Sequence, residues 1–376
     1  MRFVVTGGGT GGHIFPAIAV CEAIKRADPG GDILYIGGVS GMETNIVPAE
    51  GIPFYAVEAR KMPARPSLAT LRGLAALARG YVQATRKLRE FGADVVIGSG
   101  GYVAAATVLA ATRQNIPTVI LENNLIPGRT NLKLAKTAGR ICVSFSETIK
   151  SFPAERCVVT GLPLRQGVVA PDRVSQVEAR AAFPGLKSDL LTLLVIGGSQ
   201  GARAVNRLVT QCAPALINSN YQIIHQIGPK NGDDVELYLK KAGLTDIAGV
   251  ANMGYVIRPF LDSSDIPLAY RAANIILCRG GISTISEAAI NGLPMVIIPL
   301  PTSYADHQTK NALALESIGA ARCLRETDLN AVELTGAIVN LFKDAALRPA
   351  MSSASLQFGK PGAADDVVRL AMELVN

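Results

Sequence analysis

Short apolar runs alternate with helix-length segments along the whole chain. Continuous apolar strands that alternate with helices form parallel sheets covered on both faces. The pattern therefore predicts an α/β protein with doubly wound parallel sheets, which bind ligands at the carboxyl ends of their strands. The predicted strands are 2–5, 33–36, 54–57, 95–97, 118–121 and 141–143 in the first half, and 190–196, 222–226, 275–278, 295–298 and 320–324 in the second half.

A glycine-rich turn follows an apolar run twice, as GGGTGGH at residues 7–13 and as GGSQGAR at residues 197–203. Each has the order strand, tight turn and helix start. Glycine allows backbone N–H groups to approach an anion, and a helix N-terminus favours negative charge. Two such units predict two Rossmann-like domains that face each other across a cleft. A tight connection without a ligand is the alternative for the first turn.

A domain boundary is expected near GLPLR at residues 161–165, because weakly patterned sequence follows before Leu190. We therefore predict a first domain over residues 1–163 and a second over residues 164–349. The tail over residues 350–376 is expected to form short helices, broken near GKPG at 359–362, that pack back onto the first domain.

The first turn has the GxGxxG spacing of dinucleotide-binding proteins, which alone is a weak signal. An NAD site needs an acidic residue about 20 residues further on, near the end of the second strand. That strand ends in IGGVSG at residues 36–41, without an acid, so an NAD oxidoreductase is disfavoured. A further turn, GSGGY at residues 98–102, favours a broad acceptor site at the same sheet edge.

Composition narrows the class of protein. The chain has 376 residues, 49% of them hydrophobic, and a net charge of +7, which suits phosphates or a lipid surface. No nucleic-acid recognition motif is present. The six cysteines form no CxxC pair and are expected to be reduced core residues, and no metal site is expected. No run approaches the ~20 apolar residues of a membrane span, and no signal peptide is expected.

A third glycine turn lies in CRGGISTISE at residues 278–287. Here Glu287 could accept hydrogen bonds from a ribose diol, or it could close a capping box with Thr284 at a helix start near Ser283 or Thr284. Downstream, Asp306, His307 and Gln308 gather hydrogen-bonding groups that suit a sugar, with a solvated loop as the alternative.

Seven motifs together resemble the MurG family of peptidoglycan N-acetylglucosaminyltransferases. They are GGGTGGHIFP (7–16), GSGGY (98–102), LENN (121–124), GLPLR (161–165), GGSQGA (197–202), CRGGISTISE (278–287) and DHQTKNA (306–312). The resemblance implies a GT-B fold. It implies inverting transfer of N-acetylglucosamine from UDP-N-acetylglucosamine to the 4-hydroxyl of undecaprenyl-diphosphate-linked N-acetylmuramoyl-pentapeptide (lipid I to lipid II), without a cofactor or catalytic metal. Cell shape and division depend on this step.

The resemblance also implies a cytoplasmic-face, peripheral membrane location and a possible cell-wall synthesis complex. The sequence departs from the family pattern at His307, where many members have glutamine. It also departs at LENN, where members have His-Glu-Gln-Asn. Another nucleotide-sugar transferase, an epimerase of this fold, and a non-catalytic nucleotide-binding module are the alternatives. The implied substrate-binding residues are Thr10, Gly11, Gly12, Tyr102, Asn124, Arg165, Ser199, Gln200, Gly201, Ile257, Arg279, Ser283, Glu287, His307 and Gln308.

Two residues are candidates for the general base that deprotonates the acceptor hydroxyl. His13 is the only histidine in the first-domain turns, and its ordinary pKa suits the task. Alternatively, His13 only binds the acceptor phosphate or orients water, and Glu122 is the reserve candidate. The amides over residues 199–202, the helix dipole and Arg165 are expected to stabilise the departing UDP.

A basic stripe is expected on a helix over residues 65–89. Arg65, Arg72, Arg79 and Arg86 recur every seven residues, beside the apolar side chains of Leu68, Leu71, Leu74 and Val82. Such a surface can lie on anionic lipid. The alternative is a sheet-covering helix with a solvated basic edge.

Overall fold

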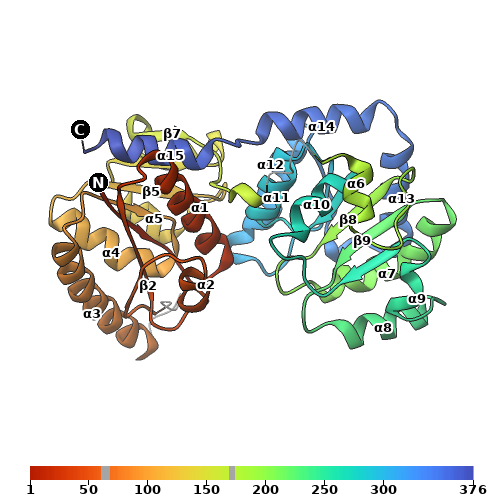
Figure 1. Cartoon of the computed structure of the whole chain (residues 1–376), viewed down its shortest axis with the longest axis horizontal. Coiled ribbons are helices and arrows are strands. Elements are labelled where there is room, and N and C mark those ends of the chain that lie inside the picture. Colours follow the sequence, from red (N-terminus) through yellow and green to blue (C-terminus); the bar gives the residue numbers. More distant parts are fainter. Residues whose placement is uncertain (61–67, 169–173, 376) are drawn as a thin grey trace. The chain divides into compact units, whose positions relative to one another are not determined.

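The computed structural model describes residues 1–60, 68–168 and 174–375. The chain forms two compact units (Figure 1). The first unit comprises Met1–Arg165 and Pro361–Asn376, and the second comprises Gln166–Lys360.

The first unit is built on a parallel sheet with the strand order β3-β2-β1-β4-β5-β6-β7. Its strands are β1 (Arg2–Thr6), β2 (Asp32–Gly38), β3 (Phe54–Val57), β4 (Val95–Gly98), β5 (Thr118–Glu122), β6 (Arg140–Val143) and β7 (Cys157–Val159). Its helices are α1 (Gly11–Ala27), α2 (Glu43–Ala49), α3 (Leu68–Phe91), α4 (Gly101–Arg113), α5 (Arg129–Leu134) and α15 (Ala363–Glu373), with 3-10 turns η1 (Ser146–Ser151) and η2 (Ala154–Arg156).

Alternate residues of the central strand β1 point to opposite faces of this sheet. Phe3 and Val5 pack with α1 and α15, whereas Val4 packs with α3, α4 and α5. Both faces are therefore covered, as the continuous apolar strands predict.

The second unit repeats this architecture with the parallel strand order β10-β9-β8-β11-β12-β13. Its strands are β8 (Thr192–Ile196), β9 (Gln222–Gln226), β10 (Tyr255–Arg258), β11 (Ile275–Cys278), β12 (Met295–Ile297) and β13 (Ala321–Cys323). Its helices are α6 (Gln176–Ala181), α7 (Arg203–Asn218), α8 (Gly232–Lys241), α9 (Ile247–Ala251), α10 (Asp265–Ala272), α11 (Ile282–Ile290), α12 (His307–Ser317), α13 (Ala331–Lys343) and α14 (Leu347–Phe358), with 3-10 turns η3 (Gln166–Val168), η4 (Tyr304–Asp306) and η5 (Glu326–Asp328).

The two parallel sheets confirm the predicted α/β class. The pattern missed β7 and β10. β7 has only three residues and lies at the sheet edge, where its side chains are partly exposed, so it lacks the apolar signal of an inner strand. β10 has only three buried residues, Tyr255–Ile257, before the partly exposed Arg258, so its apolar run is short.

The C-terminal segment returns to the first unit later than the expected residue 350. Helix α14 packs against α11 instead, with Met351 in the core of the second unit and the Ser355 hydroxyl donating to the Leu293 carbonyl at 2.9 Å. The chain crosses at Pro361, and α15 then packs along α1 (Figure 1). The apolar face of α14 complements the second core, which the tail's sequence alone did not reveal.

The cysteines lie in or near the two cores. All six are free thiols, four of them fully buried and Cys157 and Cys323 half-buried. Burial raises the pKa of the Cys21, Cys142 and Cys278 thiols to about 12. Across the described ranges, no helix is long and apolar enough to cross a bilayer.

Candidate functional site

Three loops of the first unit meet at the carboxyl edge of its sheet. The turns after β1 and β4 are neighbours because Thr6 pairs with Gly98 where the strand order reverses. The loop after β5 joins them, since the Asn123 amide donates to the Gly12 carbonyl at 3.3 Å. This is the topological switch point, where open α/β sheets bind their ligands.

His13 lies between these loops and is held in a defined tautomer. Its Nδ1 lies 3.0 Å from the Ser99 carbonyl oxygen, and the Ser99 hydroxyl donates back to the His13 carbonyl. Since a carbonyl oxygen only accepts, Nδ1 carries the proton, and Nε2 is the basic nitrogen of the neutral ring. The Ser99 contacts thus fix the orientation of the imidazole.

Glycines after β4 make room for this ring. Gly100 and Gly101 have φ values of 104° and 80°. A Cβ atom at Gly100 would lie 2.8 Å from the His13 Nδ1, and one at Gly101 would meet the Gly8 carbonyl. The GSGG sequence is therefore required by the close approach of the two turns.

Tyr102 and Thr10 lie beside His13. The Tyr102 ring covers Gly9, where a Cβ would come within 2.8 Å of its Cε1. Burial raises the pKa of the Tyr102 phenol, and the Glu43 carboxylate raises it further. Thr10 is exposed at the N-cap of α1, where its side chain makes no capping hydrogen bond. Gly11 and Gly12 follow, half-buried, in the first turn of the helix.

Glu122 is buried at the end of β5, with both carboxylate oxygens engaged. Oε1 accepts from the Asn124 N–H at 3.1 Å, and Oε2 accepts from the Gly128 N–H and the Asn131 amide, both at 2.9 Å. Burial raises the pKa of Glu122, and these hydrogen bonds oppose the rise. The carboxylate thus folds the loop that carries Asn124.

Arg165 belongs to the first unit. Its guanidinium stacks on the Phe15 ring of α1, with 4.6 Å from Cζ to the ring centre. Glu50 lies 3.8 Å from its Nη1.

The second glycine turn joins β8 to α7 at the equivalent edge of the second sheet. Ser199 and Gln200 are exposed there, and Gly201, with a φ of 72°, donates to the Gly198 carbonyl at 2.9 Å. A Cβ at Gly201 would collide with the Ile227 carbonyl. The helix N-terminus and these turn amides form the element that commonly binds a diphosphate.

Buried amide side chains support this turn from behind. Gln226 donates to the Gly198 carbonyl at 3.1 Å, and Asn231 donates to the Gln200 carbonyl at 3.1 Å. Deeper still, His225 lies 3.1 Å from the Asn206 amide oxygen and 2.8 Å from the Tyr255 hydroxyl. Burial lowers the pKa of His225 to about 3, so this ring is neutral.

Glu287 lies in the interior of α11 and not in a capping box. The helix begins at Ile282 with Gly281 as its N-cap, so Thr284 already lies within the first turn and cannot cap. The capping alternative is therefore wrong. The Tyr270 hydroxyl donates to Glu287 Oε2 at 2.7 Å, and both burial and this carboxylate raise the pKa of Tyr270. Ser283 precedes Glu287 by four residues, on the same helix face.

The Arg279 guanidinium binds backbone carbonyls and a carboxylate of the same unit. It donates to the carbonyls of Ile298 and Pro299 at 3.1 and 3.2 Å and forms an ion pair with Glu326. The side chain therefore ties the loop after β12 to η5. Ile257 lies in β10 with its side chain in the core of the second unit.

The loops after β11 and β12 meet through Gly280. A Cβ at Gly280 would collide with the Gln308 backbone, and Asn311 donates to the Gly280 carbonyl at 3.2 Å. Gln308 accepts from the Leu300 N–H at 2.9 Å, and His307 Nδ1 lies 2.7 Å from the Tyr304 carbonyl. These two residues thus share an edge of the sheet with the Arg279 turn.

The backbone is strained just before His307. Ala305 and Asp306 have φ values of 50° and 55°, which L residues seldom adopt. Such outliers concentrate at ligand-binding sites.

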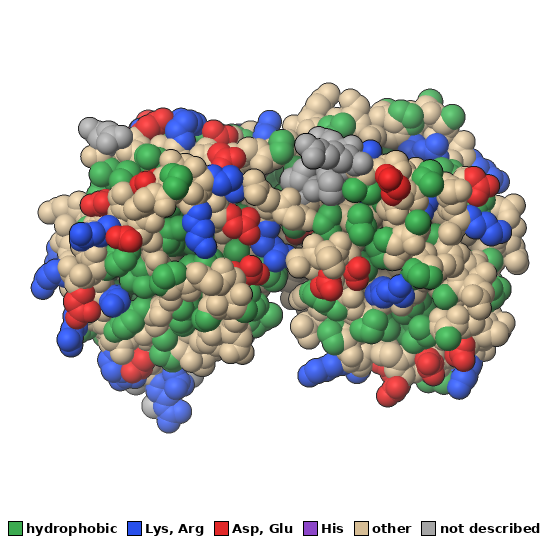
Figure 2. All heavy atoms as spheres, viewed as in Figure 1, with side chains coloured by type: hydrophobic (Ala, Val, Ile, Leu, Met, Phe, Trp, Pro, Cys, Tyr) green, Lys and Arg blue, Asp and Glu red, His purple; other side chains and the backbone are tan. Residues whose placement is uncertain are grey.

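Helix α3 carries the described part of the basic stripe. Arg79 pairs with Glu58 at 2.8 Å and Arg86 with Glu90 at 2.6 Å, which partly neutralises the stripe. Arg65 and the side chains of Leu68 and Leu71 lie outside the described residues. Lys and Arg side chains gather along the edge of the first unit where α3 runs (Figures 1 and 2).

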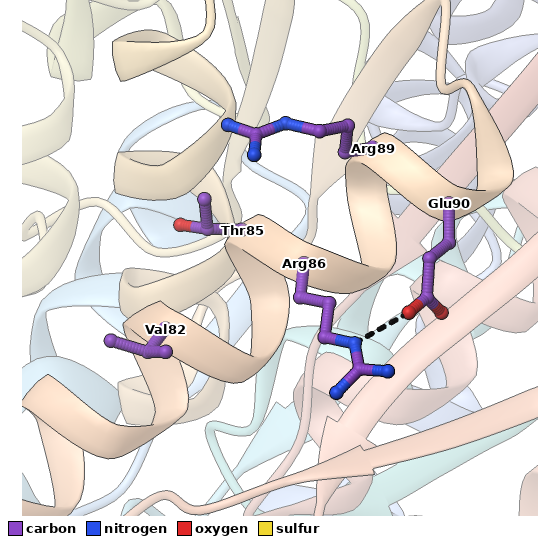
Figure 3. Close-up of a pocket in the computed structure, with 5 residues that line it drawn as sticks. All are labelled: Val82, Thr85, Arg86, Arg89 and Glu90. Atoms are coloured by element: carbon purple, nitrogen blue, oxygen red, sulfur yellow. Dashed lines mark hydrogen bonds and ion pairs between the residues drawn. The ribbon is translucent and has the colours of Figure 1, made fainter.

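A surface pocket lies on this helix. It is lined by Val82, Thr85, Arg86, Arg89 and Glu90 (Figure 3). Val82, which is 64% exposed, lines the pocket together with Arg86 and Arg89, and Leu74 of the same helix is 48% exposed.

Sequence reasoning missed several residues that shape the loops. Glu43, Asn123, Gln226, Asn231 and Tyr270 each bind a loop or a candidate side chain through a partly buried hydrogen bond. Their partners are distant in sequence and are mostly backbone atoms, which leave no motif. Asn123 is the exception, because it lies within the LENN motif that the sequence analysis identified.

The architecture is that of a two-domain glycosyltransferase. Residues 3–143 match the N-terminal domain of glycosyltransferase family 28, and residues 192–367 match the C-terminal domain of that family. A UDP-N-acetylglucosamine 2-epimerase from Neisseria meningitidis, solved with UDP-N-acetylglucosamine bound, shares the fold at 13% identity, with a TM-score of 0.69 over 99% of this chain and 100% of that one.

Full-length relatives narrow the assignment. The UDP-N-acetylglucosamine–N-acetylmuramyl-(pentapeptide) pyrophosphoryl-undecaprenol N-acetylglucosamine transferase of Halothermothrix orenii is 37% identical over 98% of each chain. The crystal structure of Acinetobacter baumannii MurG matches with a TM-score of 0.76 and 29% identity over 99% of each chain. The chain belongs to the MurG family of N-acetylglucosaminyltransferases.

Proposed function

We infer that this protein transfers N-acetylglucosamine from UDP-N-acetylglucosamine to the 4-hydroxyl of undecaprenyl-diphosphate-linked N-acetylmuramoyl-pentapeptide, which converts lipid I to lipid II. The observation that carries this inference is similarity over nearly the whole chain to transferases of that name. A reaction with two substrates, a donor and an acceptor, is consistent with two separate glycine turns, one in each unit.

The direct experiment is transfer of labelled sugar from UDP-N-acetylglucosamine to detergent-solubilised lipid I. Formation of lipid II with release of UDP is the expected result. Hydrolysis of the donor without transfer, or no reaction with lipid I, would contradict the assignment.

We assign acceptor binding to the first unit, Met1–Arg165 and Pro361–Asn376, and donor binding to the second, Gln166–Lys360. Within the first domain, Thr10, Gly11, Gly12, Tyr102 and Asn124 would contact the acceptor. This assignment is supported by the position of these residues on three loops that meet at the topological switch point.

His13 is the proposed general base. The acceptor oxygen forms a bond to the anomeric carbon while the bond from that carbon to the diphosphate oxygen breaks. The hydroxyl proton moves to His13 Nε2, and UDP leaves with the electron pair of the broken bond. The Nδ1–H bond to Ser99 supports this role because it leaves Nε2 as the basic nitrogen.

Glu122 fits a positioning role better than a proton-accepting one. Its two oxygens already accept three N–H groups at 2.9–3.1 Å. A base must exchange such partners for the substrate proton, and each broken hydrogen bond to a charged group costs about 1.5–3 kcal/mol. We propose that Glu122 holds Asn124 in place.

Donor binding is proposed for the loops of the second domain. The amides of Ser199, Gln200 and Gly201, at the N-terminus of α7, would bind the diphosphate and stabilise the charge that UDP gains on departure. We propose that these groups, with Arg165, perform this task without a metal ion and that the reaction uses no cofactor.

The remaining donor contacts are proposed from the same edge of that sheet. Glu287 would accept hydrogen bonds from the ribose diol, with Tyr270 fixing its carboxylate. Ser283 and Ile257 would border the nucleoside, and His307 and Gln308 would bind the sugar hydroxyls. Arg279 would act indirectly, since its guanidinium holds the surrounding carbonyls and Glu326.

We also propose that α3 lies on anionic lipid at the cytoplasmic face of the membrane, as a lipid-linked acceptor requires. Its exposed Leu74 and Val82 beside arginines support this location. We propose as well that the protein takes part in a wider cell-wall synthesis complex.

Vesicle co-sedimentation tests the α3 proposal. The double variant Arg72→Glu/Arg79→Glu should lose binding to phosphatidylglycerol vesicles, whereas Lys241→Glu/Lys343→Glu changes net charge equally on the second unit and should retain it. Equal binding by both variants would contradict the proposal.

An epimerase activity is the second candidate, because a UDP-N-acetylglucosamine 2-epimerase shares the fold. Epimerisation needs no acceptor. Incubation with UDP-N-acetylglucosamine alone, followed by product analysis, separates the two functions.

A further inference from the structure

Two short segments carry the chain between the units, one after Arg165 and one before Pro361. The first connecting segment is residues 166–168 and the second is residues 357–360, and both belong to the second unit. Each of them contacts the C-terminal end of α11, the helix that carries the proposed ribose ligand Glu287.

The first connecting segment is attached to α11 by a side-chain amide. Asn291 follows the last residue of α11, and its Nδ2 donates to the Val168 carbonyl at 3.2 Å and to the Glu287 carbonyl at 2.8 Å. Val168 is 3% exposed, so the segment is packed into the unit at this point. The two N–H groups of one amide therefore join the segment to the helical turn that carries Glu287.

The second connecting segment is attached to α11 through close contact at Gly359. A Cβ atom there would lie 2.9 Å from the Ile290 backbone nitrogen and 3.0 Å from the Ala289 carbonyl carbon. Gly359 has a φ of −61°, which any L residue adopts, so the close approach requires glycine and the backbone conformation does not. Nearby, the Ser355 hydroxyl donates to the Leu293 carbonyl at 2.9 Å and fixes α14 beside the same end of α11.

Glu287 and these attachment points lie within about one turn of the same helix. Glu287 and Asn291 are four residues apart, which places them on one face and about 6 Å apart along the helix axis. A hydrogen-bonded helix is a rigid element that can carry an energetic coupling between the groups attached to it. A ligand that restrains Glu287 therefore also restrains the attachment points of both connecting segments.

The helix of the second glycine turn has different neighbours. Helix α7, whose N-terminus would bind the diphosphate, packs against α8 and α13. The ribose contact and the diphosphate contact thus fall on different helices, and α11 is the one attached to the connecting segments. The ribose diol is therefore the part of the nucleotide that should act on these segments.

We propose that α11 couples ribose binding to the two connecting segments, with Asn291 and Gly359 as positioning residues. A diol bound to Glu287 restrains α11, and the two attachments pass this restraint to residues 166–168 and 357–360. Arg165, the proposed ligand of the departing diphosphate, directly precedes the first segment, so ribose binding also orders the chain next to it. The identity of the ligand rests on the proposed function, whereas the attachments are contacts of the structure.

Hydrogen exchange of the full-length protein with and without UDP tests the coupling. UDP should slow exchange over residues 197–203 and over both connecting segments. Inorganic pyrophosphate has no ribose, so at a concentration that protects residues 197–203 equally it should leave the connecting segments unchanged. Equal protection of these segments by both ligands, or protection by UDP that stops at residues 197–203, would overturn the proposal.

Two variants interrupt the attachments one at a time. Asn291→Ala removes both N–H donors and should lower the UDP-induced protection of residues 166–168 about fivefold, the effect of one hydrogen bond between neutral groups, while residues 357–360 keep theirs. Gly359→Ala places a methyl group against the Ile290 backbone and should give the reverse pattern. A general loss of stability would affect both segments alike, so equal changes in both, or a change in neither, would contradict the proposal.

Gly362→Ala is the matched control for Gly359→Ala. Its φ is −83°, and among the described residues no heavy atom beyond its chain neighbours lies within 4 Å of its Cβ position. The control should therefore keep the protection of both segments, and a loss equal to that of Gly359→Ala would count against the role of Gly359. If Gly359→Ala does not fold, Asn291→Ala carries the comparison.

A double-mutant cycle gives a second readout in the transfer reaction. Asn291→Ala should lower kcat about fivefold and leave the KM for lipid I within about twofold. In an Arg165→Ala background the same change should have little further effect, because residues that act together are not additive. Additive losses would overturn the link to Arg165. If wild-type protein failed to use lipid I while UDP gave the expected exchange pattern, the proposed function would fail and the coupling would stand.

Discussion

In the first unit a carboxylate lies beneath the glycine turn, whereas in the second unit neutral amides support the corresponding turn. The two turns follow equivalent strands and lead into equivalent helices. The difference lies in the groups around them. Similar glycine sequences can therefore be held in place by supporting groups of different charge.

Among the variants that test this comparison of the two units, the largest loss of activity is expected at His13. His13→Ala should lower kcat by about 10²–10⁴-fold, the usual contribution of a general base. UDP-N-acetylglucosamine affinity should stay unchanged, because His13 belongs to the first unit. Steady-state kinetics and calorimetric titration with UDP measure the two quantities, and normal turnover would remove His13 as the base.

A complementary loss is expected in the second unit. Glu287→Ala should weaken UDP-N-acetylglucosamine binding about 10–100-fold, since hydrogen bonds to a charged group are lost, and should leave acceptor KM unaffected. Tyr270→Phe, which removes only the donor to Glu287, should cause a smaller loss. Unchanged donor affinity in Glu287→Ala would contradict the ribose assignment.

The buried His225 predicts a pH dependence for the second unit. Its pKa is about 3 when folded and 6.5 when unfolded, so between these values the unfolded chain binds the extra proton. The contribution of neutral, buried His225 to the free energy of unfolding is fully present above pH 6.5 and is lost as the pH falls toward 3. At pH 5 the loss is roughly 2 kcal/mol.

Urea unfolding at several pH values, followed by a probe in each unit, measures this loss. The second unit should weaken more steeply than the first on acidification. His225→Gln should flatten that slope, and an unaltered slope in the variant would assign the effect to other groups.

Paired glycine substitutions test the two turns separately. Gly100→Ala brings a Cβ within 2.8 Å of His13 Nδ1, and Gly201→Ala places one against the Ile227 carbonyl. Each also strains a positive φ by about 1–2 kcal/mol. The first should impair acceptor turnover and the second donor binding, as kinetics with each substrate varied can measure; the opposite pattern would exchange the roles of the two turns.

The fold could be predicted from the sequence because buried parallel strands are apolar throughout. The strands that were missed, β7 and β10, are short or end in charged residues. The tail was assigned too early to the first domain, because the core that binds Met351 of α14 comes from distant segments.

The candidate site was predicted less completely. Motifs located the turns, but the residues that orient them act on backbone atoms far away in sequence. Gly9 lies 34 residues from Glu43, and Tyr270 lies 17 residues from Glu287. The capping box failed because α11 begins at Ile282, before Thr284. Such shifts of helix start are the least certain part of a sequence prediction.

Hydrogen exchange with and without UDP, read at both glycine turns, tests the central claim most directly. The account predicts slower exchange over residues 197–203 and no change over residues 7–13, because donor binding is assigned to the second unit. Protection of residues 7–13 by UDP, with residues 197–203 unaffected, would contradict it.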